Sequence, residues 1–119
     1  TLSFDLLIIG TWQGNGPSVQ PLPYIPTYWG VRVGQTVLAE YTFSNSAGYT
    51  QNFPAPNRTA RTGSEANNTL GYPGGDSIYR LRYSINSSTS SLPLVFYTRN
   101  YTPQRGEQWG LDNVEVHVE

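Results

Sequence analysis

Hydrophobic and polar residues alternate along several short segments of this chain. Residues 1–9 show the pattern most simply, because Leu2, Phe4, Leu6 and Ile8 share one parity while the other parity begins with polar residues. Alternation with a period of two is typical of a strand that buries one face. It predicts strands at residues 1–9, 28–33, 36–44, 76–86, 92–99 and from 107 onward.

The segments between these strands are rich in glycine and proline, which break regular structure. Residues 10–27 and 45–75 form the two long loops, and we expect Phe53 and Leu70 to pin the second one to the body. Gly34 and Gln35 fit a two-residue hairpin turn. The sequence therefore predicts an all-β fold, a single antiparallel β-sandwich of jelly-roll or immunoglobulin-like type over residues 1–119 with long Pro/Gly-rich loops.

The closing strand carries the most specific expectation. Asp112, Val114, Val116 and Val118 share one parity, so the three valines predict the buried face of that strand and Asp112 lies on the same face. A buried carboxylate must be satisfied by a cation, an arginine or several hydrogen-bond donors. The strand is therefore expected to close the sandwich and to mark the one place where the chain holds a metal.

Composition narrows the possible functions. The net charge is −1 and only 13% of the residues are charged, so no electrostatic field draws nucleic acid or an anionic membrane to the chain. No apolar run approaches the roughly 20 residues that span a bilayer. Cysteine is absent, which excludes disulfides and thiolate zinc sites. We expect neither nucleic acid nor a membrane span among the partners.

We also expect no enzyme. His117 is the only histidine, and it lies on the polar parity of the closing strand without the partners that acid–base catalysis needs. The eight acidic residues are scattered, and the serines have no nucleophile motif.

Four N-x-[ST] sequons begin at Asn57, Asn67, Asn86 and Asn100. They fall in predicted loops or at strand ends, where N-glycosylation of a secreted protein takes place. Polar loop composition alone is the other explanation, and the sequence does not separate the two. The sequons favour an extracellular or cell-surface location.

Five short motifs occur in a fixed order along the chain. They are TLSFDL at residues 1–6, WQGN at 12–15, TFSN at 42–45, DSIYRL at 76–81 and EQWGLDNV at 107–114. In this order they resemble a small β-sandwich module of secreted and surface-anchored bacterial proteins, whose closing strand has the form [DE]-x-W-G-[IL]-D-N-V. The resemblance implies a structural calcium site, with Glu107 and Asp112 as its acidic ligands and neutral oxygens from Gln13 and Asn15 nearby.

Aromatic residues gather in and after the first loop. Trp12, Tyr24, Tyr28 and Trp29 fit a stacking platform for sugar rings, an anchor of a protein–protein interface, or lids folded over the sandwich. The sequence leaves all three open.

Together these features predict a non-enzymatic extracellular structural module. Its strand edges are expected to associate with other copies in a surface layer or pilus-like fibre. The alternative is a carbohydrate-binding module that uses the loop aromatics, with calcium in a structural role.

Overall fold

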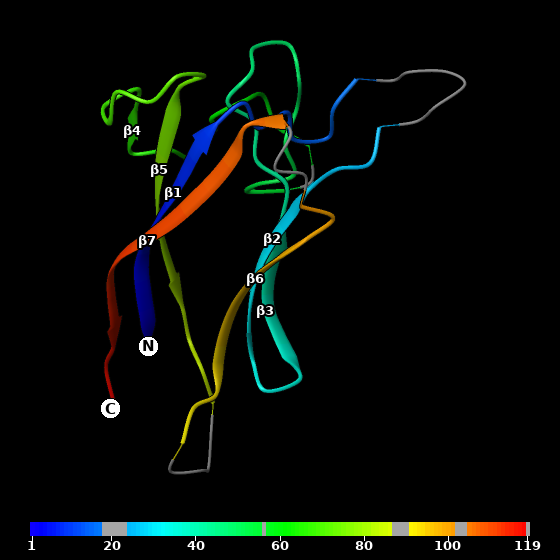
Figure 1. The fold of residues 1–119 in the computed structure, drawn as a ribbon. Coiled ribbons are helices and arrows are strands. Elements are labelled where there is room, and N and C mark those ends of the chain that lie inside the picture. The colour runs from blue at the N-terminus through cyan, green and yellow to red at the C-terminus, as the bar shows by residue number, and fades with distance from the viewer. Residues whose placement is uncertain (18–23, 56, 87–90, 102–104, 119) are drawn as a thin grey trace.

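The computed structural model describes residues 1–17, 24–55, 57–86, 91–101 and 105–118. Within these residues the chain forms two antiparallel sheets packed face to face (Figure 1). One sheet has the strand order β4-β5-β1-β7 and the other the order β3-β2-β6. The strands are β1 (Leu2–Gly10), β2 (Tyr28–Val33), β3 (Thr36–Tyr41), β4 (Ala66–Asn67), β5 (Asp76–Tyr83), β6 (Leu94–Arg99) and β7 (Glu107–Val116). The predicted all-β sandwich is confirmed.

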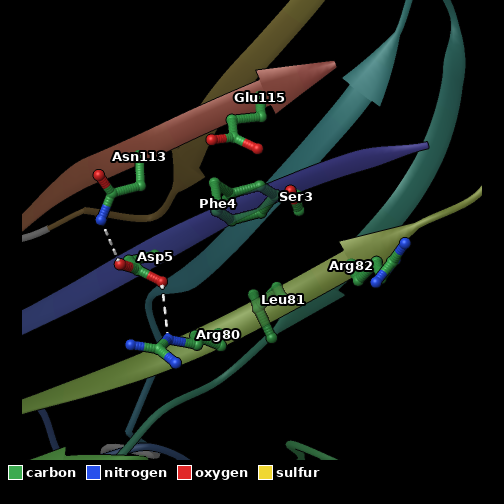
Figure 2. A pocket seen from close by; sticks show the side chains of 8 residues that line it. All are labelled: Ser3, Phe4, Asp5, Arg80, Leu81, Arg82, Asn113 and Glu115. Atoms are coloured by element: carbon green, nitrogen blue, oxygen red, sulfur yellow. Dashed lines mark hydrogen bonds and ion pairs between the residues drawn. The ribbon is translucent and has the colours of Figure 1, made fainter. Parts of the chain in front are cut away.

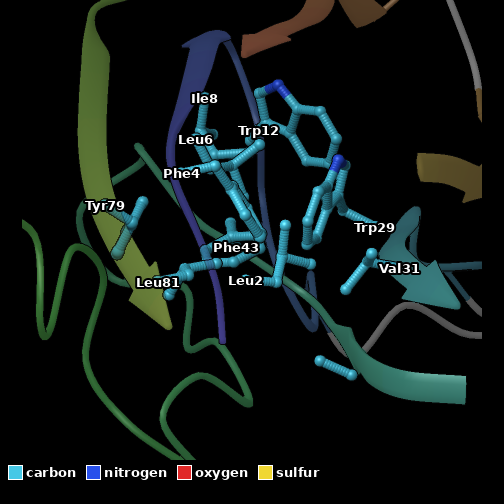
Figure 3. Close-up of a cluster of buried hydrophobic side chains, with 11 residues drawn as sticks. Leu2, Phe4, Leu6, Ile8, Trp12, Trp29, Val31, Phe43, Tyr79 and Leu81 are labelled. Carbon is cyan, nitrogen blue, oxygen red and sulfur yellow. The ribbon is translucent and has the colours of Figure 1, made fainter. Parts of the chain in front are cut away.

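The core lies between the sheets and is dominated by aromatic rings (Figure 3). Phe4 of β1 reaches the opposite sheet, where its ring centroid lies 5.2 Å from that of Phe96 in β6 and 5.7 Å from that of Trp29 in β2. Edge-to-face and tilted ring pairs of this kind each stabilise a fold by about 0.5–1.5 kcal/mol beyond area burial. The fully or nearly fully buried hydrophobic residues are Leu2, Phe4, Leu6, Ile8, Trp12, Trp29, Val31, Ala39, Phe43, Tyr79 and Leu81.

A β-bulge in β3 changes which residues face the core. Val31 pairs with Ala39, but the next residue, Arg32, pairs with Val37, so Leu38 is an extra residue on the β3 side. The bulge turns Val37 to the outer face, where it is exposed, while Leu38 packs partly against the core. Alternation places Val37 on the same face as Ala39, Tyr41 and Phe43, with Leu38 as the exception, and that placement is wrong for Val37. The hairpin turn is confirmed, with Gly34 at a positive φ of 53°.

A second bulge divides β7. Ser3 pairs with Glu115 and Asp5 with Asp112, so residues 113 and 114 together face the single residue Phe4. Asn113 takes a φ of 53°, a left-handed conformation that asparagine tolerates better than most residues. The Asp112 carboxylate accepts a hydrogen bond from the Asn113 N–H at 2.8 Å, which supports the bend locally.

The bulge reverses the parity on which the closing-strand prediction rested. Asp112 is exposed, opposite Asp5 on the outer face, and the prediction that it is buried is wrong. Val114 and Val116 stand on the inner-face parity, where Val116 pairs with the buried Leu2. They are nevertheless exposed, as is Val118, and they lie at the outer edge of the sheet, where β7 is the last strand. The prediction that these valines form a buried face is wrong as well.

An amide and a carboxylate side chain, Asn45 and Asp76, hold the long second loop to the sandwich. Asn45 Nδ2 donates to the backbone oxygens of Ile8 and Gly10, each at 3.0 Å, and its Oδ1 accepts from the Ser77 hydroxyl. Asp76 accepts from the N–H groups of Thr69 and Leu70 at 3.0 and 3.1 Å. These bonds replace the strand pairing that a loop lacks, and they satisfy backbone groups that burial would otherwise leave unpaired.

Gln51 is the centre of this loop packing and is fully buried. Its Oε1 accepts from the N–H groups of Ser44 at 2.9 Å and Arg61 at 3.1 Å, and its Nε2 donates to the carbonyls of Phe53 at 2.8 Å and Thr62 at 3.1 Å. One side chain thus ties together four points of the loop.

Phe53 pins the loop as predicted, with its ring centroid 4.9 Å from that of Tyr41 and 5.3 Å from that of Tyr79. Leu70 does not, because it is exposed.

Candidate functional site

The first half of β7 is fastened to the closed part of the sandwich. Trp109 packs edge-on against Trp29, with ring centroids 6.1 Å apart. The buried Glu107 carboxylate accepts a hydrogen bond from the Thr27 hydroxyl at 2.7 Å. Trp12 Nε1 donates to the backbone oxygen of Gln108 at 2.8 Å. This half therefore has partners on its inner face and on its backbone.

The second half of β7 differs, because its apolar side chains are left in solvent. The exposed fractions are 45% for Val114, 41% for Val116 and 92% for Val118. Only β1 pairs with this part of β7 within the described residues. The outer end of the four-stranded sheet thus carries a short apolar strip, residues 114–118, which we call the valine edge.

The backbone of the valine edge points away from the sheet at alternate residues. Thr1 and His117 exchange two hydrogen bonds. The His117 N–H donates to the Thr1 oxygen at 2.9 Å, and the Thr1 amine donates to the His117 oxygen at 2.8 Å. In an antiparallel pair, hydrogen-bonded and non-hydrogen-bonded residue pairs alternate. Val116 belongs to the next, non-hydrogen-bonded pair, with Leu2, so its N–H and C=O point to the open edge. Figure 1 shows the two ends of the chain side by side at this end of the sheet.

The outer face beside the valine edge is polar and holds a shallow pocket (Figure 2). Asp5 lies at its centre, 3.4 Å from Arg80 Nε, and accepts a hydrogen bond from Asn113 Nδ2 at 2.8 Å. Further along β7, Glu115 and His117 lie 2.9 Å apart. Charged groups thus line one face of the strand and valines the other.

Glu107 and Asp112 do not converge on one site. Asp112 comes five positions after Glu107 along a regular part of β7, so their side chains leave the strand on opposite faces, Glu107 into the interior and Asp112 into solvent. Among the described residues no group of three or more His, Cys, Asp or Glu side chains is placed to hold a metal. A calcium ion shared by Glu107 and Asp112 would need a different arrangement of the strand.

Two of the four predicted stacking aromatics belong to the core. Trp12 and Trp29 are fully buried. Trp12 folds back from its loop, and its Nε1 donates to the backbone oxygens of Ile9 and Gln108, so the lid interpretation holds for this residue. Neither tryptophan offers a ring face to a sugar or a partner protein in this structure, which corrects both of those interpretations for them.

The two tyrosines are half-buried, and each lies beneath an arginine. The Arg105 guanidinium lies 4.3 Å from the centroid of the Tyr24 ring, and a Cβ atom at Gly16 would come within 2.0 Å of the same ring. The Arg99 guanidinium lies 4.2 Å from the centroid of Tyr28. Such cation–π contacts stabilise by about 0.5–1 kcal/mol at exposed sites and hold the rings in place.

Tyr28 belongs to a polar cluster on the outer face of β3-β2-β6 that the sequence analysis missed. The end of the Tyr97 ring lies over Gly30, where a Cβ atom would come within 2.4 Å of it. The Tyr97 hydroxyl donates to Glu40 at 2.6 Å, and Arg99 lies 2.6 Å from the other carboxylate oxygen. We call Tyr28, Glu40, Tyr97 and Arg99 the tyrosine face.

Burial, charge and hydrogen bonding shift the pKa values of groups in the tyrosine face. The hydrogen bond from Tyr97, followed by Arg99, holds the pKa of Glu40 below its usual range. Burial and then the Glu40 carboxylate raise the pKa of Tyr97 to about 12. A sequence signal for this cluster exists, because Tyr97 and Arg99 share the parity opposite to Leu94 and Phe96.

All four sequon asparagines, Asn57, Asn67, Asn86 and Asn100, are exposed. Exposure is a precondition for glycosylation but does not show that a glycan is attached, so glycosylation at the sequons stays a prediction. Ser88 and Thr102, the hydroxyl residues of the last two, lie outside the described residues.

The described residues contain no helix that is both long and apolar enough to cross a bilayer. Comparison with known proteins adds no relative, since no family model, curated protein or solved structure matches the chain. The resemblance to bacterial surface modules therefore remains a prediction from its motifs.

Proposed function

We propose that this chain is a non-enzymatic structural module of an extracellular or cell-surface protein that assembles with copies of itself into a layer or fibre. The observation that carries the proposal is the valine edge, where outward backbone groups run beside exposed apolar side chains. An unpaired edge is a template for pairing with another strand. Natural monomeric proteins often protect such edges with lysine or proline, and residues 114–118 contain neither.

The rest of the surface supports a binding role rather than catalysis. His117 lies exposed beside Glu115 on the outer face of β7, a position suited to surface pairing. The most buried acidic side chain near the site, Glu107, is engaged by Thr27 inside the sandwich. Low charge reduces the electrostatic repulsion between copies, which favours close packing of identical chains.

Sedimentation velocity over a range of concentrations, with negative-stain electron microscopy, tests the proposal on the whole chain. We expect concentration-dependent association and ordered assemblies. A Val114→Lys/Val116→Lys variant should abolish both, because lysine on an edge opposes strand addition. The matched control is Val37→Lys, which changes a similarly exposed valine on the outer face of β3. Wild-type protein that stays monomeric at every concentration contradicts the proposal.

The same measurement in calcium and in chelator tests the structural calcium that the motifs imply. Assembly or melting that responds to chelator would support an ion at Glu107 or at Asp112. Because the two residues lie on opposite faces, only one of Glu107→Gln and Asp112→Asn should remove that response. A response that both variants abolish would require a shared ion and a rearranged strand.

The tyrosine face favours a second candidate function, carbohydrate binding. Two tyrosine rings lie on a sheet surface beside a carboxylate and a guanidinium, which are groups that bind sugar hydroxyls. Tyr28→Ala and Tyr97→Ala should abolish binding on a glycan array, whereas Tyr72→Ala, in an exposed loop, should not. A wild-type chain that binds no glycan rejects this candidate and leaves self-association unaffected.

A further inference from the structure

We infer that two copies pair antiparallel along their β7 strands, about a two-fold axis that places Val116 opposite the partner's Val116. The inference rests on the proposed self-association and specifies its first contact, a five-residue pairing of the valine edge with itself. The four-stranded sheets of the two copies become one continuous sheet.

The backbone of the valine edge fits this register. The N–H and C=O groups of Val116 point to the open edge, so a partner strand centred there forms a hydrogen-bonded pair at that residue. Two residues away on either side, Val114 meets the partner's Val118. Residues directly opposite in an antiparallel pair share a face. All three exposed valines of each copy therefore fall in one apolar strip.

The polar side chains on the other face, Glu115 and His117, favour the same register. Pairing centred on Val116 puts Glu115 opposite the partner's His117, and by symmetry His117 opposite the partner's Glu115. A slip that centres the pair on residue 115 would set two glutamates against each other, and a slip to residue 117 would set two histidines together. Within one copy these two groups already lie 2.9 Å apart, so both face the same way. A histidine ring N–H donates a hydrogen bond to a carboxylate directly across a strand pair, whereas two carboxylates directly opposite each other repel.

The two-fold symmetry of the contact limits the size of the assembly that it can form. A two-fold contact uses the same surface on both copies and closes on itself. Pairing of β7 therefore yields a dimer, and a layer or fibre needs a second surface. Five paired residues make a weak contact, so covalent trapping is the appropriate measurement.

Because the chain has no cysteine, a single introduced thiol reports the register. In a hydrogen-bonded antiparallel pair the Cα atoms lie about 5.5 Å apart, a separation that a disulfide spans. Val116→Cys should therefore form a covalent dimer under mild oxidation. Val114→Cys is the matched control, because the two copies of residue 114 would lie about 14 Å apart along the strands. A mixture of Val114→Cys and Val118→Cys should cross-link even though neither does so alone.

Charge reversal gives a second measurement that needs no thiol. His117→Glu should weaken the wild-type dimer about tenfold in sedimentation equilibrium, because like charges then face each other at both ends of the pair. Glu115→Lys combined with His117→Glu should restore it. The circular dichroism spectra of all variants should match the wild type, since the substituted side chains are exposed.

The outcomes separate this inference from the proposed function. A wild-type chain that associates, with no cross-link at residue 116 and no response to charge reversal, overturns the register and leaves self-association standing. A wild-type chain that never associates overturns both. Equal cross-linking at residues 114 and 116 overturns the register alone.

Discussion

The two halves of β7 share a strand and a partner, β1, yet they meet different surroundings. From Glu107 to Leu111 the inner side chains pack on Trp29 and Thr27, at the end of the sandwich that the loops close. Beyond the bulge at Asn113, Val114 and Val116 face inward by parity but are exposed. Pairing with β1 is common to both halves, so pairing alone does not decide burial. What lies across the sandwich decides it.

The largest effect is expected where the covered half meets the core. Trp29→Ala removes the ring that contacts Trp109, Phe4 and Phe43 and leaves a cavity in a closely packed interior. We expect a loss of about 3–5 kcal/mol in the free energy of unfolding, measured by urea denaturation. A loss below about 1 kcal/mol would mean that the covered half is not held by this packing.

Gln51→Ala tests whether the loop packing closes that end of the sandwich. The change leaves two N–H groups and two carbonyls without their buried partner. We expect a loss of about 2–4 kcal/mol in thermal or urea unfolding, because each unsatisfied buried group costs about 1–3 kcal/mol unless water reaches it. Asn57→Ala, at an exposed position of the same loop, is the control and should change stability by less than about 0.5 kcal/mol.

The bulge that separates the two halves can be strained directly. Asn113→Val puts a β-branched residue at a φ of 53° and should cost about 1–3 kcal/mol. Asn113→Gly keeps the conformation accessible, so its melting temperature should stay close to that of the wild type. Equal effects of the two substitutions would show that the bulge is absent in solution.

Removing one hydrogen bond of the half-exposed tyrosine face should change the stability less than the substitutions in the core, the loop and the bulge. Tyr97→Phe removes the hydrogen bond that most lowers the pKa of Glu40, so that pKa should rise toward 4.5, measured by NMR titration. A carboxyl with a lowered folded pKa stabilises the fold above its unfolded pKa and loses that stabilisation as the pH falls through the folded pKa. The acid-side decline in stability should therefore flatten in the variant. The effect at neutral pH should be below about 1 kcal/mol because solvent screens the cluster.

The smallest effect is expected on the valine edge. Val116→Asp should fold, with a change below about 1 kcal/mol in the free energy of unfolding of the monomer, because 41% of this side chain is already exposed. Asp112→Ala, also at an exposed position, should be similarly mild. A Val116→Asp chain that fails to fold would show that the valine edge is covered in solution, and the contrast between the two halves would disappear.

The sequence predicted the parts of the fold that depend on local pattern. Alternation placed β1 and its buried face correctly, and Gly34 marked the hairpin. Alternation failed where an extra residue entered a strand, at Leu38 and at Asn113, because a bulge is a property of two strands together. The burial of Trp12 could not be predicted from local pattern either, because its hydrogen-bond partner Gln108 is 96 residues away along the chain.

The candidate site likewise has features that the parity within one strand predicts and features that depend on the assembled sheets. The odd spacing between Glu107 and Asp112 was enough to place them on opposite faces of one strand. The shared parity of Tyr97 and Arg99 was enough to place both on one face of β6, but their position beside Tyr28 depends on the pairing of β6 with β2. Exposure of the valines was not predictable, because it depends on what packs against each half of β7, which only the assembled topology specifies.

The hydrogen bonds between Thr1 and His117 also have a mechanical consequence. Both residues lie at the same end of an antiparallel pair, so a force that separates them acts across the strands and loads one pair of bonds at a time. Strands pulled in this way lose their hydrogen bonds one pair after another, so they separate at a lower force than strands sheared along their length. A tether attached at these two residues would open β1 from β7 early, so an assembly that bears load is better served by carrying tension through side-to-side contacts between modules.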